Sequence, residues 1–307
     1  MFIIGHHKIR ERLKNLATVN KVSQGYLFFG PESVGKILCA EEFARWLVSG
    51  SDFEPNIKRV HSPDVYIVRP ETETKRGVTK QKSISAEAMR EALIFLSRFP
   101  SSGNFRVVIV EEAHKLSQTA QNVLLKTLEE PNTTAVIILV THSIGAILPT
   151  ILSRVEKIRF DYVPLEEITA GVSSVLSSGQ EQNIAPFFFS LGRPGMILRA
   201  ARNPENFTEE RKKLERLFKL SSLQLNERLQ LAEELSKNVP ECIRLLEWWL
   251  PGLHTQALKF STAGKGVETQ YATRFFELLE RVEQTLTLMK NTQSNTRLLL
   301  EKLFLSV

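Results

Sequence analysis

The alternation of apolar and polar positions is most informative in the middle of the chain. Two short apolar runs, 107–110 and 135–140, have the length and the β-branched content of buried parallel strands. The segment between them repeats apolar residues every three or four positions, which predicts a helix that Pro131 stops. Polar residues follow both runs: two glutamates after the first, and 141–143 after the second. Since open α/β sheets bind ligands where their strands end, these polar residues are candidates for a functional site.

The first half of the chain offers further elements on the same basis. We expect a helical lead-in at 1–24, a strand at 26–29, a helix at about 38–48, a strand-like run at 64–68 and a helix at about 86–99. Within the last helix we expect Ile94, Leu96 and Phe99 to lie in the core. The polar stretch 71–82, rich in lysine and arginine, is predicted to be a surface loop. This half therefore has the composition of an α/β domain.

The second half has a different pattern. Residues 164–200 indicate a small helical lid, and Asn203-Pro204 is a plausible hinge. From residue 207 onward, apolar positions recur at helical spacing, and no motif with a known chemistry is present. We expect at least one of Trp248 and Trp249 to lie in the core, and the other could belong to an interface.

A phosphate-binding pattern follows the aromatic strand. Gly30, Ser33, Gly35 and Lys36 nearly satisfy G-x-x-x-x-G-K-[ST], in which glycines let backbone N–H groups wrap a phosphate and the lysine reaches its outer oxygens. The strand–loop–helix context supports a P-loop. However, Ile37 replaces the hydroxyl residue that normally coordinates Mg²⁺.

The strand at 107–110 ends in a second altered motif. A P-loop enzyme normally has Asp followed by Glu here, with the first holding the metal and the second orienting the attacking water. In this chain the pair is Glu111-Glu112, so both metal-binding positions differ from the pattern. Because phosphoryl transfer depends on Mg²⁺, we expect a weak or vestigial nucleotide site and little ATP hydrolysis. Alternatively, the two glutamates only cap the next helix and solvate the strand end.

Composition limits the possibilities without selecting a function. The 307 residues suffice for two or three domains, and the net charge of +6 permits nucleic-acid contact without requiring it. No apolar run reaches membrane-spanning length and the N-terminus lacks a signal-peptide pattern, so we expect a cytoplasmic protein that does not contact a membrane. Cys39 and Cys242 are the two cysteines, too few for a cysteine-based zinc site, and we expect no zinc.

Taken together, these motifs resemble the delta-prime subunits of the bacterial DNA polymerase III clamp loader, which are AAA+ proteins related to the gamma/tau ATPases. The resemblance covers roughly residues 1–200 and is carried by GYLFFGPESVGK at 25–36, HSPD at 61–64, VVIVEEAH at 107–114, NVLLKTLEEP at 122–131, LPTILSR at 148–154 and GRPG at 192–195.

The resemblance implies an architecture of three parts. It predicts an α/β AAA+ P-loop module with a parallel sheet at 1–160, a helical lid at 161–203, and an all-α collar at 204–307 that joins subunits into a ring. In this family, residues 3–6 of the lead-in would lie near the adenine of a nucleotide.

The resemblance also implies a function. We expect a non-catalytic, stator-like subunit of the DNA polymerase III holoenzyme, a DNA-directed DNA polymerase, that helps to load the sliding clamp on primed DNA. Its partners would be the gamma/tau and delta subunits, the beta clamp through the complex, and DNA. No cofactor would be required, although ATP or ADP could bind weakly. The alternatives are an active gamma/tau-like ATPase motor, for which the intact Lys36 is the main argument, and a nucleotide-independent scaffold.

Arg154 has a special place in this interpretation. In the family, the Ser-Arg pair that contains it faces ATP bound to the neighbouring subunit, so Arg154 would act in trans as an arginine finger. The alternative is an ordinary surface arginine paired with Glu156 or Asp161.

Three departures from the family pattern qualify the resemblance. Val155 replaces a cysteine after Arg154, which is a small apolar exchange. Many members have a four-cysteine zinc module after the P-loop helix, but 48–61 is short and contains no cysteine. Gly195 stands where the ATPases carry a nucleotide-sensing arginine, which is a further reason to expect no hydrolysis.

Overall fold

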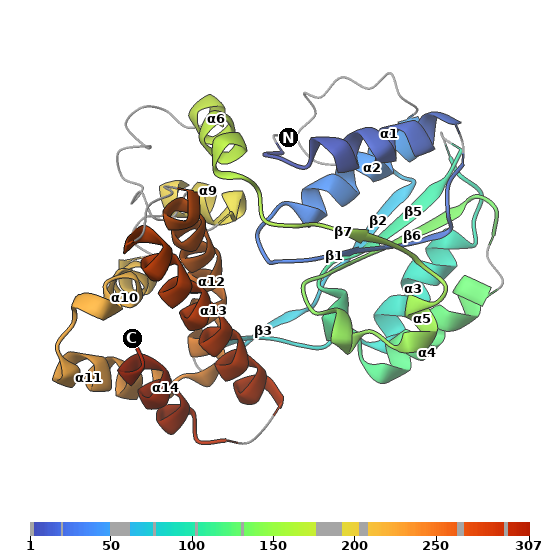
Figure 1. Cartoon of the computed structure of the whole chain (residues 1–307). Helices are drawn as coiled ribbons and strands as arrows, with labels where there is room; N and C mark the ends of the chain where they lie inside the picture. Colours follow the sequence, from blue (N-terminus) through green and yellow to red (C-terminus); the bar gives the residue numbers. More distant parts are fainter. Residues whose placement is uncertain are drawn as a thin grey trace. The chain divides into compact units, whose positions relative to one another are not determined.

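The chain forms two compact units, Met1–Glu167 and Ile168–Val307. Figure 1 shows the computed structural model coloured along the sequence, with a mixed sheet-and-helix part and an all-helical part. The structure describes residues 3–19, 21–49, 62–75, 78–101, 104–129, 132–175, 192–202, 208–262, 267–291 and 294–307. The predicted stop at Pro131 and the hinge at Asn203-Pro204 lie outside these residues. The predicted division between lid and collar stays a prediction.

The first unit is built on a parallel sheet of five strands. In the order of the sheet they are β2 (Val65–Val68), β5 (Arg106–Val110), β6 (Ala135–Thr141), β1 (Gly25–Phe29) and β7 (Glu156–Arg159). All neighbouring strands run parallel. The two apolar runs predicted as buried strands are β5 and β6, which lie side by side with Val107 opposite Val136. The predicted fold class, an AAA+-like α/β module followed by an all-helical region, is confirmed.

Helices cover both faces of this sheet (Figure 1). One face carries α1 (His7–Val19) and α2 (Lys36–Ser49), and the other carries α3 (Ala86–Leu96), α4 (Gln118–Glu129) and the short α5 (Pro149–Leu152). Alternate residues of each strand supply the two cores because side chains along a strand point to opposite faces. Val107 and Ile109 belong to the α1–α2 side, and Val108 and Val110 to the α3–α4 side.

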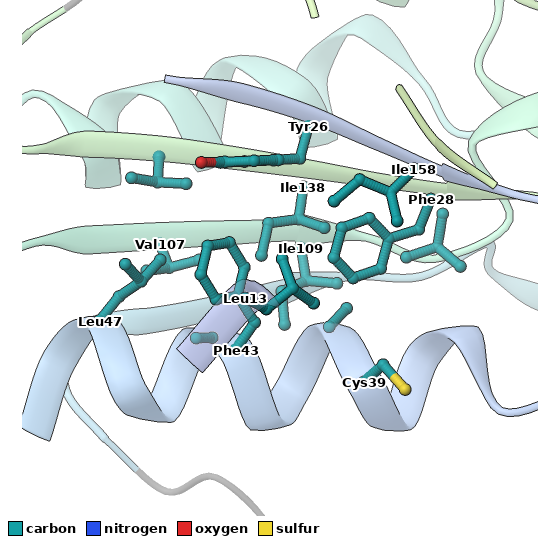
Figure 2. Packing of buried hydrophobic residues seen from close by; sticks show 14 of the residues in the cluster. Leu13, Tyr26, Phe28, Cys39, Phe43, Leu47, Val107, Ile109, Ile138 and Ile158 are labelled. Atoms are coloured by element: carbon teal, nitrogen blue, oxygen red, sulfur yellow. The ribbon is translucent and has the colours of Figure 1, made fainter. Parts of the chain in front are cut away.

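Aromatic residues of β1 and α2 pack together in the core between the sheet and α2, shown close up in Figure 2. Tyr26 and Phe28 of β1 project toward Phe43 of α2, and the rings of Tyr26 and Phe43 meet edge to face with centroids 5.1 Å apart. All three side chains are fully buried. This packing fixes α2, and with it the loop between β1 and α2, against the sheet.

Two predictions for this unit were wrong. The polar stretch 71–82 is not a loop: it contains an antiparallel hairpin of β3 (Thr72–Lys75) and β4 (Val78–Gln81). Backbone pairing stabilises such a hairpin without an apolar pattern, so hydrophobicity alone did not reveal it.

The other error concerns the apolar residues near the end of α3. The helix ends at Leu96, which is buried as predicted, but Ile94 is 57% exposed and Phe99 is 86% exposed. The buried face of α3 consists of Ala86, Met89, Ala92 and Leu96. Ile94 lies on the other side of this helix, and Phe99 lies beyond its end, where the helical spacing no longer applies.

The second unit is helical throughout its described part, as predicted from residue 207 onward. Its helices are α9 (Pro194–Arg202), α10 (Thr208–Phe218), α11 (Leu225–Ser236), α12 (Val239–Thr262), α13 (Val267–Asn291) and α14 (Thr296–Leu305), with α6 (Leu165–Val175) at the boundary between the units. Helices α12 and α13 pack along each other, and α11 packs on α14. Trp248 and Trp249 are both buried, which confirms the expectation that at least one lies in the core. Gly252 lets α12 approach α10 closely, because a Cβ there would come within 2.2 Å of the Phe218 ring.

Candidate functional site

The loop between β1 and α2 has the backbone shape that its glycines predict. Gly30 has φ 138° and Gly35 has φ 104°, both in the region that favours glycine, and Ser33 adopts φ 64°. Gly30 also packs against the chain after β7: a Cβ there would lie 2.0 Å from the Phe160 carbonyl oxygen. Helix α2 starts at Lys36, so its first N–H groups face the loop. The local architecture is that of a P-loop.

The lysine of this loop is turned onto its own backbone. The Lys36 ammonium donates to the Gly30 carbonyl at 2.8 Å and also to the Pro31 carbonyl, and the residue is only 7% exposed. A phosphate would replace these carbonyls as acceptor, since an ammonium group forms stronger hydrogen bonds with an anion. The Lys36 ammonium group therefore lies at the loop, directed at the loop's own backbone.

The N-terminal segment lies against the same loop. The His6 Nε2 atom is 3.1 Å from the Val34 carbonyl oxygen, and its ring meets Phe160 edge to face. Burial lowers the pKa of His6, although its bond to Val34 opposes this shift. Ile3 is buried in the core beside α1 and α2. Residues 3–6 thus border the loop.

The metal-binding positions do not fit Mg²⁺. Ile37 packs its apolar side chain against the core on the α2 face and offers no oxygen. Glu111, at the end of β5, accepts a hydrogen bond from Arg69 Nε at 2.7 Å. A carboxylate that already neutralises a guanidinium is a poor ligand for a hard cation, which needs several free oxygens. No group of three or more metal-binding side chains occurs among the described residues.

Glu112 is also paired with a basic side chain. It adopts a left-handed backbone (φ 53°, ψ 47°) at the start of the 3-10 turn η1 (Ala113–Lys115), and its carboxylate pairs with Lys115. Its side chain makes no capping hydrogen bond to that turn. In an ATPase this position must orient water, and the pair with Lys115 competes with that role.

The structure also brings together two histidines: His142, which is one of the polar candidates at 141–143, and His114, which was not selected from the sequence. His114 follows β5 and His142 follows β6, and their ring centroids are 4.0 Å apart. The His114 Nδ1 atom lies 3.4 Å from the hydroxyl of Thr141, which is 1% exposed. Burial, followed by the neighbouring His142, lowers the pKa of His114 to about 4. The polar residues after the two strands were the available signal, because the ends of adjacent parallel strands meet at one edge.

Arg154 lies at the amino ends of the parallel strands, whereas the P-loop lies at their carboxyl ends. It precedes β7, whose first residue pairs with Tyr26 near the start of β1, while Gly30 follows the end of β1. The five residues of β1 separate these two ends of the sheet by roughly 17 Å. Arg154 therefore cannot contact a phosphate bound at its own Lys36.

The guanidinium of Arg154 is held by its own chain. It forms an ion pair with Glu129 at 2.9 Å, at the end of α4, and donates to the Thr150 carbonyl at 3.0 Å and to Ser153. The alternative partners expected from the sequence are engaged elsewhere: Glu156 accepts from Arg12, and Asp161 accepts from Arg159. Arg154 remains 37% exposed, which leaves part of its donor set accessible.

The remaining sequence-selected positions lie in the second unit or outside the described residues. Gly195 is in α9, where Arg199 Nε donates to its carbonyl oxygen at 3.3 Å, and the buried Arg193 donates to the Glu247 carbonyl. Most of the segment 48–61 lies outside the described residues. The described helices include none that is both long and apolar enough to cross a membrane.

Comparison with known proteins decides the family. Residues 5–164, more than half of the chain, match the sequence family described as DNA polymerase III, delta subunit. The chain belongs to this family. The matched range includes the P-loop, the two glutamates and Arg154.

Individual relatives of this delta-subunit family member are DNA polymerase III subunits. The chain is 30% identical to a gamma subunit of Buchnera aphidicola over 174 residues, which cover 57% of this chain and 47% of the relative. It is 30% identical to a delta' subunit of Pseudomonas aeruginosa (43% and 41% covered) and 26% identical to a delta' subunit of Bacillus subtilis (69% and 64% covered). The chain thus spans less than two thirds of the length of each of these three relatives. A gamma-subunit-related protein of Thermotoga maritima aligns over 95% of this chain and 97% of its own, with 20% identity and a TM-score of 0.45.

Proposed function

We propose that this chain is a non-catalytic subunit of a DNA polymerase III clamp loader, in which it helps to load the sliding clamp on primed DNA. Membership of the delta-subunit family and similarity to gamma, tau and delta' subunits support this role. The partners would be the gamma/tau and delta subunits, and through them the clamp and DNA. Such an assembly would work in the cytoplasm, where DNA replication takes place in bacteria.

The observation that carries the non-catalytic assignment is that Glu111 and Glu112, the two acids that follow β5, are both paired with basic side chains. Arg69 binds Glu111 and Lys115 binds Glu112, while Ile37 supplies no oxygen to a metal. Phosphoryl transfer needs a metal to neutralise the phosphates and an acid to orient the water, and here both acids pair with basic side chains instead. The well-placed Lys36 supports the alternative of a gamma-like motor, but it serves nucleotide binding as well as hydrolysis.

The position of Arg154 supports a role in a neighbouring ATP site. It lies at the sheet edge opposite its own P-loop and is partly exposed, so the phosphate it could reach belongs to another subunit. A guanidinium is permanently charged and presents forked donors, which suit the charge that develops on a transferred phosphoryl group.

Reconstitution tests this role. With wild-type gamma/tau and delta subunits, Arg154→Ala should assemble normally but reduce the ATPase stimulated by clamp and DNA by at least tenfold, because arginine fingers contribute on the order of 10³–10⁵ in rate and a ring has several. Arg159→Ala is a matched control, since Arg159 is a more exposed arginine paired with Asp161. Unchanged stimulation in an intact complex would exclude the finger role.

Two further measurements separate the alternatives. The purified chain alone should show no turnover of ATP, in contrast to a motor subunit. Clamp loading on primed DNA should fail when the chain is omitted. If the chain were a scaffold that has lost its role in loading, omitting it would leave clamp loading unchanged.

A further inference from the structure

Arg69 occupies a position that sequence reasoning did not single out. It follows directly after β2, and Glu111 follows directly after the neighbouring parallel strand β5, so both lie at the carboxyl ends of the strands. Its Nε donates to Glu111 Oε2 at 2.7 Å, and its NH2 atom lies 3.9 Å from Glu41 Oε1. One guanidinium therefore faces two carboxylates from two different elements.

One of these carboxylates, Glu41, belongs to the helix that starts at the P-loop, and the other, Glu111, follows β5. Glu41 lies on α2, five residues after Lys36 and roughly 7.5 Å further along the helix. Glu111 stands where P-loop enzymes hold their metal. The Glu41 side chain is only 8% exposed, whereas that of Arg69 is 57% exposed. The cation thus covers the carboxylates from the solvent side.

The two negative charges of Glu41 and Glu111 favour a cation beside them. Two carboxylates that face one point repel each other unless a positive charge lies between them. In P-loop enzymes a divalent metal supplies such charge beside the phosphates, but here Ile37 removes one ligand and Arg69 already satisfies Glu111. The site has lost one metal ligand at Ile37, and its two remaining carboxylates face a side-chain cation instead.

We propose that Arg69 is a built-in substitute for the divalent metal at this edge of the sheet. It holds α2, the end of β2 and the end of β5 together and keeps Glu111 from binding a cation. This inference goes beyond the proposed role in clamp loading, and it can be tested on the isolated chain.

A metal titration without nucleotide tests it. The probe is Mn²⁺, which accepts carboxylate ligands and can be followed by the loss of the electron paramagnetic resonance signal of the free ion. The wild-type chain should leave Mn²⁺ free at about 1 mM, whereas Arg69→Ala should bind one ion at least tenfold more tightly through Glu41 and Glu111. Adding Glu111→Gln to Arg69→Ala should abolish this binding.

The controls make each outcome decisive. Arg90→Ala should behave like wild type, because Arg90 is an equally exposed arginine that pairs with Glu87 on α3. Arg69→Lys, which keeps the positive charge, should also bind no Mn²⁺. If Arg69→Ala does not fold, Arg69→Gln replaces it. The proposal is overturned if the wild-type chain binds one Mn²⁺ that Glu111→Gln removes, or if the Arg69 variants that lack the charge gain no binding.

Discussion

Gly30 shows how closely a single position is constrained at the P-loop. A Cβ at Gly30 would meet the Phe160 carbonyl at 2.0 Å, and its φ of 138° disfavours any other residue. We expect Gly30→Ala to lower the free energy of unfolding by about 2–4 kcal/mol, because backbone strain and a backbone clash add together. Urea denaturation would measure this. Gly145→Ala is the control, since a Cβ there has nothing within 4 Å, and an equal loss in both variants would contradict the explanation.

His114 makes stability depend on pH. Its pKa is about 4 in the folded chain and about 6.5 when unfolded, so between these values the unfolded state binds more protons and folding stability falls as pH decreases. The stabilisation is complete above about pH 6.5 and lost progressively toward pH 4. The loss should be about 1–2 kcal/mol, because solvent screens a half-buried ring.

His114→Gln should remove this part of the pH dependence. The measurement is the unfolding free energy of both proteins in urea at pH 7.5 and pH 5. His254→Gln, a change at an exposed histidine of α12, should leave the wild-type dependence intact. Parallel profiles for wild type and His114→Gln would show that another group titrates.

At the scale of elements, Arg106 joins the start of β5 to the end of α3. Its guanidinium lies 3.4 Å from Asp64, donates to the carbonyls of Phe99 and Phe95, and stacks over the Phe95 ring. Asp64 is completely buried. Arg106→Met removes the cation beside this carboxylate and should destabilise the chain by about 3–5 kcal/mol, the usual cost of breaking a buried ion pair.

The same pair can be tested by a double mutant. Asp64→Asn together with Arg106→Met should cost less than the sum of the two single changes, because the uncompensated carboxylate is then absent. Chemical denaturation of the four proteins gives the coupling. Strict additivity would mean that Arg106 acts through its packing on Phe95 alone.

How well the sequence predicted each element depended on what stabilises it. The strands β1, β5 and β6 are buried on both faces, so they appear as continuous apolar runs. The hairpin of β3 and β4 is held by backbone pairing between polar residues, and no apolar period marks it. Ile94 and Phe99 were assigned to the core by composition, although their positions relative to the helix axis place them outside it.

The candidate site was predictable to a similar extent. The loop with Gly30, Gly35 and Lys36 could be located because its chemistry is local in sequence. The pairing of Glu111 with Arg69 joins residues 42 positions apart, and that of Arg154 with Glu129 joins separate elements. Such contacts depend on strand order and helix docking, which a single sequence does not specify.

At the scale of the molecule, we expect the first unit to fold without the second. Residues 1–167 contain the whole parallel sheet and both cores that pack on it. A fragment of residues 1–175 should therefore fold alone with a cooperative transition, which circular dichroism would detect. Without the helical unit it should no longer co-purify with gamma/tau subunits. Stoichiometric recovery of the fragment would place the main contacts in the first unit.

The placement of Lys36 and Arg154 at opposite edges of one sheet gives the first unit a direction. Subunits that meet head to tail present one edge to the preceding copy and the other to the following one. With the proposed roles, this chain can serve a neighbour through Arg154 but gains nothing from an arginine offered to its own loop, where Arg69 and Lys115 engage the acids. With these proposed roles, we expect a subunit of this kind at the end of a row of subunits, where it would complete the ATP site of one neighbour and form no such site of its own.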